Sequence, residues 1–186
     1  SRHSFPFSPK FTNKRFVAKK PSRGDVVVFK TPADNRTDYI KRLIGLPGDT
    51  IQMRNGEIFL NKKKIKKRSI KITNEINCGN EPINVNAFEE ILPNGKKYIA
   101  VYRDDGTMMN TEVFVVPDDH YFFMGDNRDC SKDSRFLSSV GYVSFINLVG
   151  KAKIIFFSND KKRGSFIKFW RWNETLRMDR FFKNIL

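Results

Sequence analysis

The fold of this 186-residue chain is decided by the stretch Tyr39-Ile40-Lys41-Arg42-Leu43-Ile44-Gly45-Leu46-Pro47-Gly48-Asp49. The first part predicts a β-strand, in which residues two positions apart lie on the same face. Lys41 would therefore share a face with Tyr39 and Leu43. The pair Pro47-Gly48 predicts a type II turn, because proline presets φ at the first central position and glycine allows a positive φ at the second. This turn would end the strand and fix the place of Lys41.

A lysine with apolar neighbours has two interpretations. Desolvation disfavours the charged ammonium and lowers its pKa from about 10.4, which would make the amine of Lys41 usable as a base. Alternatively, the stem of the side chain lies along the sheet while the ammonium reaches water. The strand alone leaves both interpretations open.

A second stretch is dense in polar side chains: Met124-Gly125-Asp126-Asn127-Arg128-Asp129-Cys130-Ser131-Lys132-Asp133-Ser134-Arg135. It follows the apolar run Tyr121-Phe122-Phe123-Met124, so it predicts a loop that leaves a buried strand. Such a loop is either a solvated turn or a hydrogen-bonded network that can orient a lysine on a rigid sheet. The residue types alone do not separate these possibilities.

Further strands are indicated on both sides of these stretches. Val26 to Lys30 is continuously apolar up to its last residue, which predicts a strand buried on both faces. Asn55-Gly56 between two short β-like runs predicts a tight hairpin, and tight hairpins join antiparallel neighbours. The remaining predicted strands are Val113 to Val116, Tyr121 to Met124, Gly141 to Val143 and Lys153 to Phe157. The fold class is therefore all-β and mostly antiparallel.

The length suits one domain with a core and an insertion. We expect a basic lead-in, a first part of the core β-domain, an insertion of β-hairpins, a second part of the core, and a C-terminal helix that is basic and aromatic. The predicted bounds are 1–23, 24–65, 66–112, 113–157 and 158–186. The amphipathic part of this helix would be residues 166–186, which would lie at the edge of a bilayer or dock on the protein's own sheet.

The formal net charge of +15 indicates an anionic partner surface. Nucleic acid and acidic phospholipid both fit, because each attracts lysine-rich surfaces. Cys78 and Cys130 are 52 positions apart and belong to no Cys-x-x-Cys or Cys/His grouping, which argues against a metal site and leaves a disulfide open. We assign His120 a structural role, because no nucleophile adjoins it in the sequence. The printed chain contains no apolar run long enough for a spanning helix.

Four stretches together resemble the successive conserved boxes of the bacterial type I signal peptidases, and the resemblance covers residues 21–157. They are Gly24-Asp25-Val26-Val27-Val28-Phe29, Tyr39 to Asp49, Gly125 to Arg135, and Val149-Gly150-Lys151-Ala152. Tyr-Ile-Lys-Arg followed by Gly-Leu-Pro-Gly-Asp is a specific signature, as is Gly-Asp-Asn-Arg-Asp followed by Ser and Asp-Ser-Arg. The resemblance implies a signal-peptidase-like β-domain.

Residue roles follow from this resemblance position by position. The general-base lysine of these serine/lysine proteases matches Lys41, and the serine thought to position that lysine matches Ser131. A neutral lysine takes a proton from the nucleophilic serine, which attacks the scissile carbonyl and forms an acyl-enzyme. The residues implied as the supporting shell are Ser131, Asp133, Arg135, Arg42 and Asp126. Cys130 would be a small residue at a position where relatives usually carry asparagine.

The chain departs from the family at the nucleophile. The family's serine lies in a Ser-Met-x-Pro box, and no Ser-Met pair occurs in these 186 residues. The opening segment, Ser1 to Pro9, resembles the region that follows that box. We therefore expect an N-terminally truncated chain that carries the base and its shell, is itself inactive, and lacks the oxyanion-hole donors near the serine.

The resemblance also implies the substrate and the location. Substrates would be secretory preproteins, cleaved after small residues in an Ala-x-Ala pattern. The location would be the bacterial inner membrane, with the catalytic domain on the periplasmic face near anionic lipid. No cofactor, metal, nucleic acid or obligate protein partner is expected. Two alternatives are a noncatalytic basic β-barrel that binds nucleic acid and a self-cleaving serine/lysine protein of the repressor type, for which we find no intramolecular cleavage segment.

Overall fold

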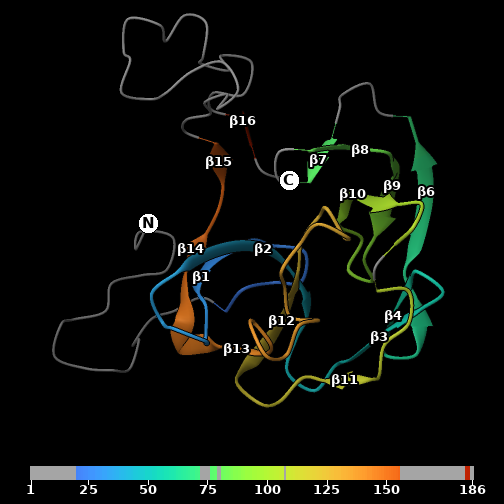
Figure 1. The fold of residues 1–186 in the computed structure, drawn as a ribbon. Helices are drawn as coiled ribbons and strands as arrows, with labels where there is room; N and C mark the ends of the chain where they lie inside the picture. Colours follow the sequence, from blue (N-terminus) through green and yellow to red (C-terminus); the bar gives the residue numbers. More distant parts are fainter. Residues whose placement is uncertain (1–19, 72–75, 79–80, 107, 156–182, 185–186) are drawn as a thin grey trace, which may run out of the picture. The chain divides into compact units, whose positions relative to one another are not determined.

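The computed structural model describes residues 20–71, 76–78, 81–106, 108–155 and 183–184 (Figure 1). In this part of the chain the only helix is a single 3-10 turn, Phe145–Asn147, and every paired strand is antiparallel to its neighbour. The strands are β1 Val26–Lys30, β2 Asp38–Gly45, β3 Thr50–Arg54, β4 Glu57–Leu60, β5 Lys63–Lys64, β6 Lys66–Ile70, β7 Ile76–Cys78, β8 Glu81–Ile83, β9 Val85–Ile91, β10 Lys97–Arg103, β11 Phe114–Val115, β12 His120–Met124, β13 Val143–Ser144, β14 Leu148–Lys151, β15 Ile154–Ile155 and β16 Lys183–Asn184. The predicted all-β, antiparallel fold class is confirmed.

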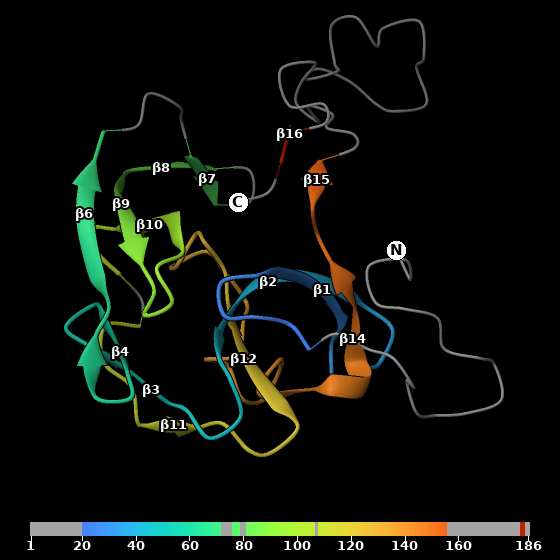
Figure 2. The ribbon, with the colours of Figure 1, turned by 180° about the vertical axis from the view of Figure 1, so that it is seen from behind.

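The strand that carries Lys41, β2, lies at the centre of a five-stranded sheet of order β13-β12-β2-β1-β14 (Figure 2). The residues of its second half alternate between two apolar cores, one on each face of the sheet. Leu43 belongs to the core that holds Phe29 and Phe123, whose rings stack with centroids 4.7 Å apart. Ile44 belongs to the other core, together with Phe122. Burial on both faces therefore fixes the register of β2, because a slip by one residue would exchange the two sets of side chains.

Both predicted turns are present, and a further turn joins β9 to β10. The Asp49 amide donates to the Leu46 carbonyl at 3.0 Å, and Gly48 has a φ of 82°, as the second central residue of a type II turn requires. Asn55 and Gly56 have φ values of 49° and 72° and join β3 to β4. Positive φ at both central positions matches the hairpin twist. Gly95, with a φ of 81°, lies in the turn between β9 and β10.

Three further sheets are built from strands β3 to β11, which lie between β2 and β12 in the sequence. The strands β11, β3, β4 and β5 form a four-stranded sheet in that order, and β10, β9 and β6 form a three-stranded one. The strands β7 and β8 pair only with each other in the described part of the chain. The three-stranded sheet contributes Tyr98 and Tyr102 to the same core as Ile44. This shared core joins it to the central sheet.

Two strands, β1 and β14, differ from the expectation. β1 is not buried on both faces: Val27 and Phe29 are fully buried, whereas Val26 and Val28 are only half-buried. Continuous apolarity in a short strand therefore did not mean two covered faces. The edge strand β14, which pairs with β1 through an irregular register, was not predicted. It has only four residues and includes a glycine, which weakens the strand signal.

Residues 152–186 form a separate compact unit. In it, Ile154–Ile155 pairs with Lys183–Asn184 in an antiparallel ladder. The helix predicted for residues 166–186 is therefore wrong at 183–184, where paired strand residues stand, and the rest of that predicted helix lies outside the described residues. Within the described ranges, the structure contains no helix of the length and apolarity that a membrane crossing requires.

Candidate active site

Lys41 lies on β2 where the strand pairs with β1 on one side and with β12 on the other. It is opposite Val27, and the neighbouring Arg42 is opposite Met124. The side chain is half-buried, and its Nζ lies 5.7 Å from the centre of the Tyr39 ring. Lys41 thus shares a face with Tyr39, as the alternation predicts.

The pKa of the Lys41 amine is lowered from its usual value. The largest cause is burial, which disfavours the ammonium; the charge of Asp133 raises the pKa, that of Arg135 lowers it, and that of Asp126 raises it. Burial therefore outweighs the effect of the two carboxylates, each of which is paired with an arginine. The amine is therefore more readily neutral than an exposed lysine.

Ser131 reaches the same region through a close contact with Gly125. Met124 is the last β12 residue paired with β2, so the next residue, Gly125, follows the ladder toward Lys41. A Cβ at Gly125 would lie 2.0 Å from Ser131 Oγ, so only glycine leaves room for this hydroxyl. Ser131 is 8% exposed, and its Oγ has no hydrogen-bond partner in the described part of the chain. The hydroxyl that the resemblance assigns to lysine positioning is buried and unpaired.

Asp133 and Arg135 form the framework of the loop. The Arg135 guanidinium donates from Nε to Asp133 Oδ1 and from Nη2 to Asp133 Oδ2, both at 2.8 Å. Asp133 Oδ2 also accepts the backbone amide of Gly125 at 2.9 Å. Both side chains are buried. The pair therefore ties the end of β12 to the far side of the loop.

Arg42 and Asp126 form a second bidentate pair, with Nε to Oδ1 and Nη2 to Oδ2 distances of 2.8 Å. The Arg42 guanidinium lies over the ring of Tyr98, 4.3 Å from its centre, and also donates to the Gly24 carbonyl at 2.9 Å. Tyr98 belongs to the core opposite the Leu43 face. Arg42 is thus adjacent to Lys41 in sequence but points to the other side of the sheet.

A buried network that the sequence did not predict lies behind the loop, centred on Arg128. Its Nη2 donates to Glu90 Oε2 at 2.8 Å, its Nη1 to the Tyr102 hydroxyl at 2.7 Å, and its Nε to the Gly125 carbonyl at 3.1 Å. Arg135 donates to the Arg128 carbonyl. The one sequence feature that could have indicated this network is a glutamate within a predicted β-strand. Nothing in the sequence pairs Glu90 with an arginine 38 positions away.

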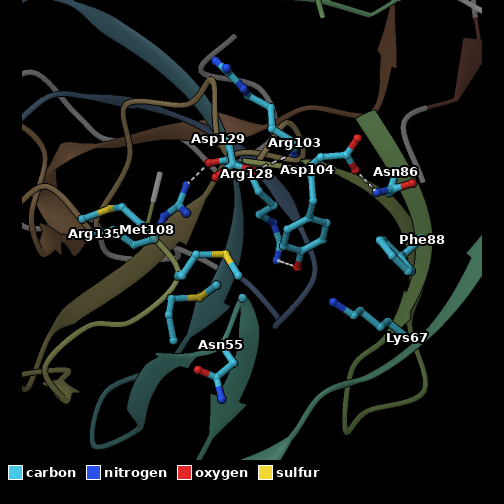
Figure 3. Close-up of a pocket in the computed structure, with 14 residues that line it drawn as sticks. Asn55, Lys67, Asn86, Phe88, Arg103, Asp104, Met108, Arg128, Asp129 and Arg135 are labelled. Atoms are coloured by element: carbon cyan, nitrogen blue, oxygen red, sulfur yellow. Dashed lines mark hydrogen bonds between the residues drawn. The ribbon is translucent and has the colours of Figure 1, made fainter. Parts of the chain in front are cut away.

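A cavity of about 180 Å³ lies behind the loop, and Arg128 and Asp129 are in its wall (Figure 3). Lys67 faces it from β6, with Nζ 4.5 Å from the centre of the Phe88 ring and 3.1 Å from a Glu57 carboxylate oxygen. Lys41 is not among the lining residues. Among the described residues, no cluster of three or more His, Cys, Asp or Glu side chains is arranged to hold a metal ion.

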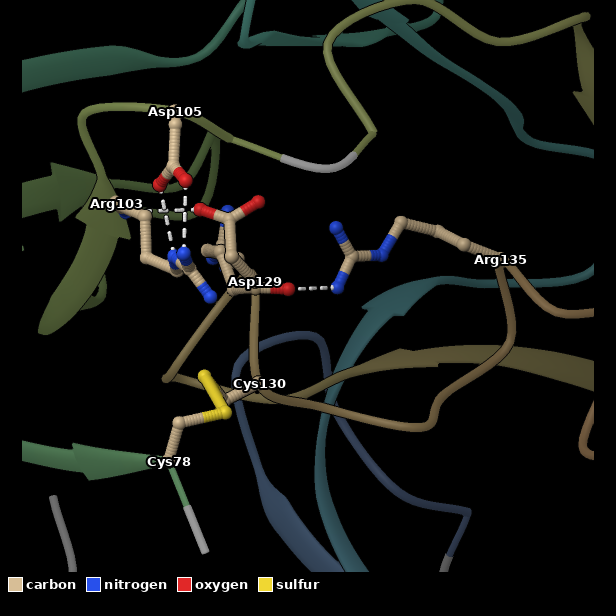
Figure 4. The surroundings of a disulfide bond; sticks show 7 residues. Cys78, Arg103, Asp105, Asp129, Cys130 and Arg135 are labelled. Carbon is tan, nitrogen blue, oxygen red and sulfur yellow. Dashed lines mark hydrogen bonds and ion pairs between the residues drawn. A yellow bond between two sulfur atoms is a disulfide. The ribbon is translucent and has the colours of Figure 1, made fainter. Parts of the chain in front are cut away.

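The question of the cysteines is settled by the structure: Cys78 and Cys130 form a disulfide, with Cα atoms 5.5 Å apart (Figure 4). Cys130 therefore does more than fill a small space in the loop. The bond joins β7 to the residue that precedes Ser131.

Comparison with known proteins shows the family of the chain. The model of the family "Signal peptidase, peptidase S26" matches residues 4–157. The chain is 41% identical to Signal peptidase I of Rickettsia typhi over 197 residues, covering 97% of this chain and 72% of that protein. It is 41% identical to Signal peptidase I of Rickettsia prowazekii over 187 residues, covering 92% and 68% respectively.

A crystal structure of a signal peptidase I from Enterococcus faecalis is 25% identical and aligns with a TM-score of 0.41, covering 72% of this chain and 97% of that one. The family assignment depends on the family model and on the rickettsial relatives. With a match over most of its length, the chain belongs to the signal peptidase, peptidase S26 family.

Proposed function

We propose that Lys41 is the general base, and Ser131 its positioning residue, in a serine endopeptidase that removes signal peptides from secretory preproteins. The family membership makes the chain a serine protease of the signal peptidase I type. The observation that carries the residue assignment is the half-buried Lys41 amine with its lowered pKa, at the sheet position that leads to the Gly125 and Ser131 contact.

The proposed mechanism uses the neutral form of Lys41. Its lone pair takes the proton of a serine hydroxyl as that oxygen attacks the scissile carbonyl, and the ammonium then protonates the leaving amine. Water hydrolyses the acyl-enzyme with Lys41 again as base. The family's serine lies in a Ser-Met-x-Pro box, and no Ser-Met pair occurs in the 186 residues. The proposal therefore assigns this chain the base and the groups that position it.

The supporting residues would hold the Lys41 amine in position and take no part in bond making or breaking. Ser131 Oγ is unpaired among the described residues, so it is free to hydrogen-bond the Lys41 amine and orient its lone pair. Asp133 and Arg135 hold the loop through Gly125, and the pair of Arg42 and Asp126 ties β2 to the residues that follow β12. Positioning of this kind governs rate, because small displacements of reacting groups are costly.

The finer assignment of partners and location is also part of this proposal. The catalytic domain would act on the periplasmic face of the bacterial inner membrane, beside anionic lipid that the charge of +15 attracts. The disulfide supports this side of the membrane, since disulfides persist in oxidising compartments. Cleavage would follow small residues in an Ala-x-Ala pattern. We propose no nucleic-acid ligand, cofactor or obligate protein partner.

The test is Lys41→Ala and Lys41→Arg in the full-length gene product, assayed on a preprotein with an Ala-x-Ala site. Both should lower kcat by about 10²-fold to 10⁴-fold or more, because alanine removes the base and arginine cannot become neutral. Lys132→Ala, an exposed lysine of the same loop, is the matched control and should keep full activity. Retained turnover in both Lys41 variants would refute the assignment.

A further inference from the structure

The disulfide joins the loop of Ser131 to a hairpin that has no other described strand partner. Cys78 is the last residue of β7, which pairs only with β8 among the described strands. Cys130 immediately precedes Ser131. Figure 4 shows the bond below the cluster of Arg103 and Asp129, on the loop that also bears Arg135.

The loop is anchored on both sides of Ser131. Before it, the Arg128 amide donates to the Val101 carbonyl, and Asp129 Oδ2 accepts the Arg103 amide, both at 2.9 Å. After it, Asp133 accepts the Gly125 amide at 2.9 Å. The Ser131 hydroxyl between these anchors has no partner in the described part of the chain. The disulfide is therefore the covalent restraint nearest to a hydroxyl that no hydrogen bond holds.

We propose that the Cys78–Cys130 disulfide is a positioning device for Ser131, and that the rate of signal-peptide cleavage depends on the thiol–disulfide state of this pair. The inference rests on the proposed roles of Lys41 and Ser131. A small dithiol reverses the state: it gives two electrons and two protons to the bond between the sulfurs, two cysteine thiols form, and the dithiol closes to its own disulfide.

Reduction would act on Ser131 through its backbone. Without the bond, Cys130 is no longer tied to the hairpin, and the loop closed by two cysteines 52 positions apart becomes open. Ser131 Oγ fits only against the bare Cα of Gly125, so a small shift of residue 130 moves the hydroxyl out of this contact. The hydroxyl proposed to orient the Lys41 amine would then be displaced, and the amine would become more exposed.

The first experiment needs no catalysis. Hydrogen exchange by mass spectrometry is followed in the 186-residue chain, oxidised and after dithiol treatment, and in Cys78→Ala. Loss of the bond should raise exchange about tenfold or more at the amides of Gly125 and Ser134, which donate to Asp133 and to the Phe123 carbonyl. Residues 26–30 of β1 should not change. Asn77→Ala, an exposed neighbour on β7 that leaves the bond intact, is the matched control.

Two exchange results would overturn the proposal. Exchange that rises in residues 76–83 alone would mean that the bond serves only the hairpin. Exchange that rises throughout, β1 included, would mean that the bond stabilises the whole fold and has no special effect on Ser131. The oxidised state is checked in each sample by thiol alkylation and intact mass.

The second experiment measures cleavage by the full-length gene product. Cys78→Ala should lower kcat about tenfold to a hundredfold with little change in KM. The acidic limb of its kcat profile should move to higher pH, because a less sheltered Lys41 has a higher pKa. The wild type should respond to dithiol in the same way, and Cys78→Ala/Cys130→Ala should not respond. An unchanged kcat and pH profile in Cys78→Ala would overturn the inference. If the proposed role of Lys41 is wrong, the Lys41→Ala variant will be active. That outcome is separate from the hydrogen-exchange result, which does not depend on catalysis.

Discussion

Replacing Glu90 by glutamine should destabilise the whole domain, because it leaves the charge of Arg128 buried without a counter-ion. Both side chains are 1% exposed, and Arg128 Nη2 lies 2.8 Å from Glu90 Oε2. Glu90 also accepts the hydroxyls of Tyr98, at 2.6 Å, and of Tyr102. Glutamine keeps the shape and one acceptor but removes the negative charge.

The expected cost follows from burial. Breaking a fully buried ion pair by removing one partner typically costs about 3–5 kcal/mol, because the remaining charge cannot be hydrated. In a domain of this size each kcal/mol corresponds to roughly 2–4 °C in Tm, so the predicted fall in Tm is roughly 6–20 °C. The hydroxyls of Tyr98 and Tyr102 stay near Arg128 and reduce the loss of stability. The expected fall in Tm is therefore toward the lower end of its range.

The assay is equilibrium unfolding of the 186-residue chain in urea, followed by circular dichroism in the far and near ultraviolet. Glu89→Gln is the matched control: Glu89 is the preceding residue, and its partly exposed ion pair with Arg68, at 3.4 Å, should be worth at most about 1 kcal/mol. Glu90→Leu/Arg128→Met should regain much of the lost stability, since no charge is left unpaired. A Glu90→Gln cost no larger than that of Glu89→Gln would refute the reasoning.

The effect should fade in acid. Burial tends to raise the pKa of the Glu90 carboxyl, but the charge of Arg128 and the hydroxyls of Tyr102 and Tyr98 together lower it from 4.5. A carboxyl with a lowered pKa in the folded state stabilises the fold above its unfolded pKa, and this contribution is lost as the pH falls through the folded pKa. The difference between the wild type and Glu90→Gln should therefore be full at neutral pH and shrink below about pH 4.5.

Two further predictions concern the environment of Lys41. Gly125→Ala should cost about 1–3 kcal/mol in urea unfolding, because its Cβ would lie 2.0 Å from Ser131 Oγ, and an added Ser131→Gly should relieve this cost; equal instability of the single and double variants would contradict the packing argument. Lys41→Met should be more stable than the wild type at pH 7, because burial lowers the pKa of Lys41, and the advantage should vanish as the pH approaches 10.5; a difference that does not change with pH would argue against a desolvated amine.

Much of the fold could be predicted because its signals are local. β2 was predicted from alternation around Lys41, and its end from Pro47-Gly48, which is a turn in the structure. The hairpin at Asn55-Gly56 has the positive φ values that its residue types indicate. β14 could not be predicted, since its stability comes from pairing with β1, a partner more than 100 positions earlier in the chain.

In the site, too, contacts between residues close in sequence could be predicted, whereas contacts between distant residues could not. The motifs place Lys41 and Ser131 on the elements that bear them, and the Asp133 and Arg135 pair needs only a two-residue spacing. Glu90 could not be connected to this site, because its partner Arg128 is brought to it only when β9 packs behind the loop. The Cys78–Cys130 bond is another long-range contact, and two cysteines without a spacing motif do not reveal it.

The arrangement of arginines explains how a base can exist in a protein of charge +15. An unpaired carboxylate beside Lys41 would stabilise its ammonium and raise its pKa. Asp133 and Asp126 both have this tendency, but each is held in a bidentate pair by an arginine, Arg135 and Arg42 respectively. The charge of Arg135 also acts directly against the ammonium. Arg135 thus opposes the two nearby acids, and burial, the largest influence on the amine, favours the neutral form that a general base requires.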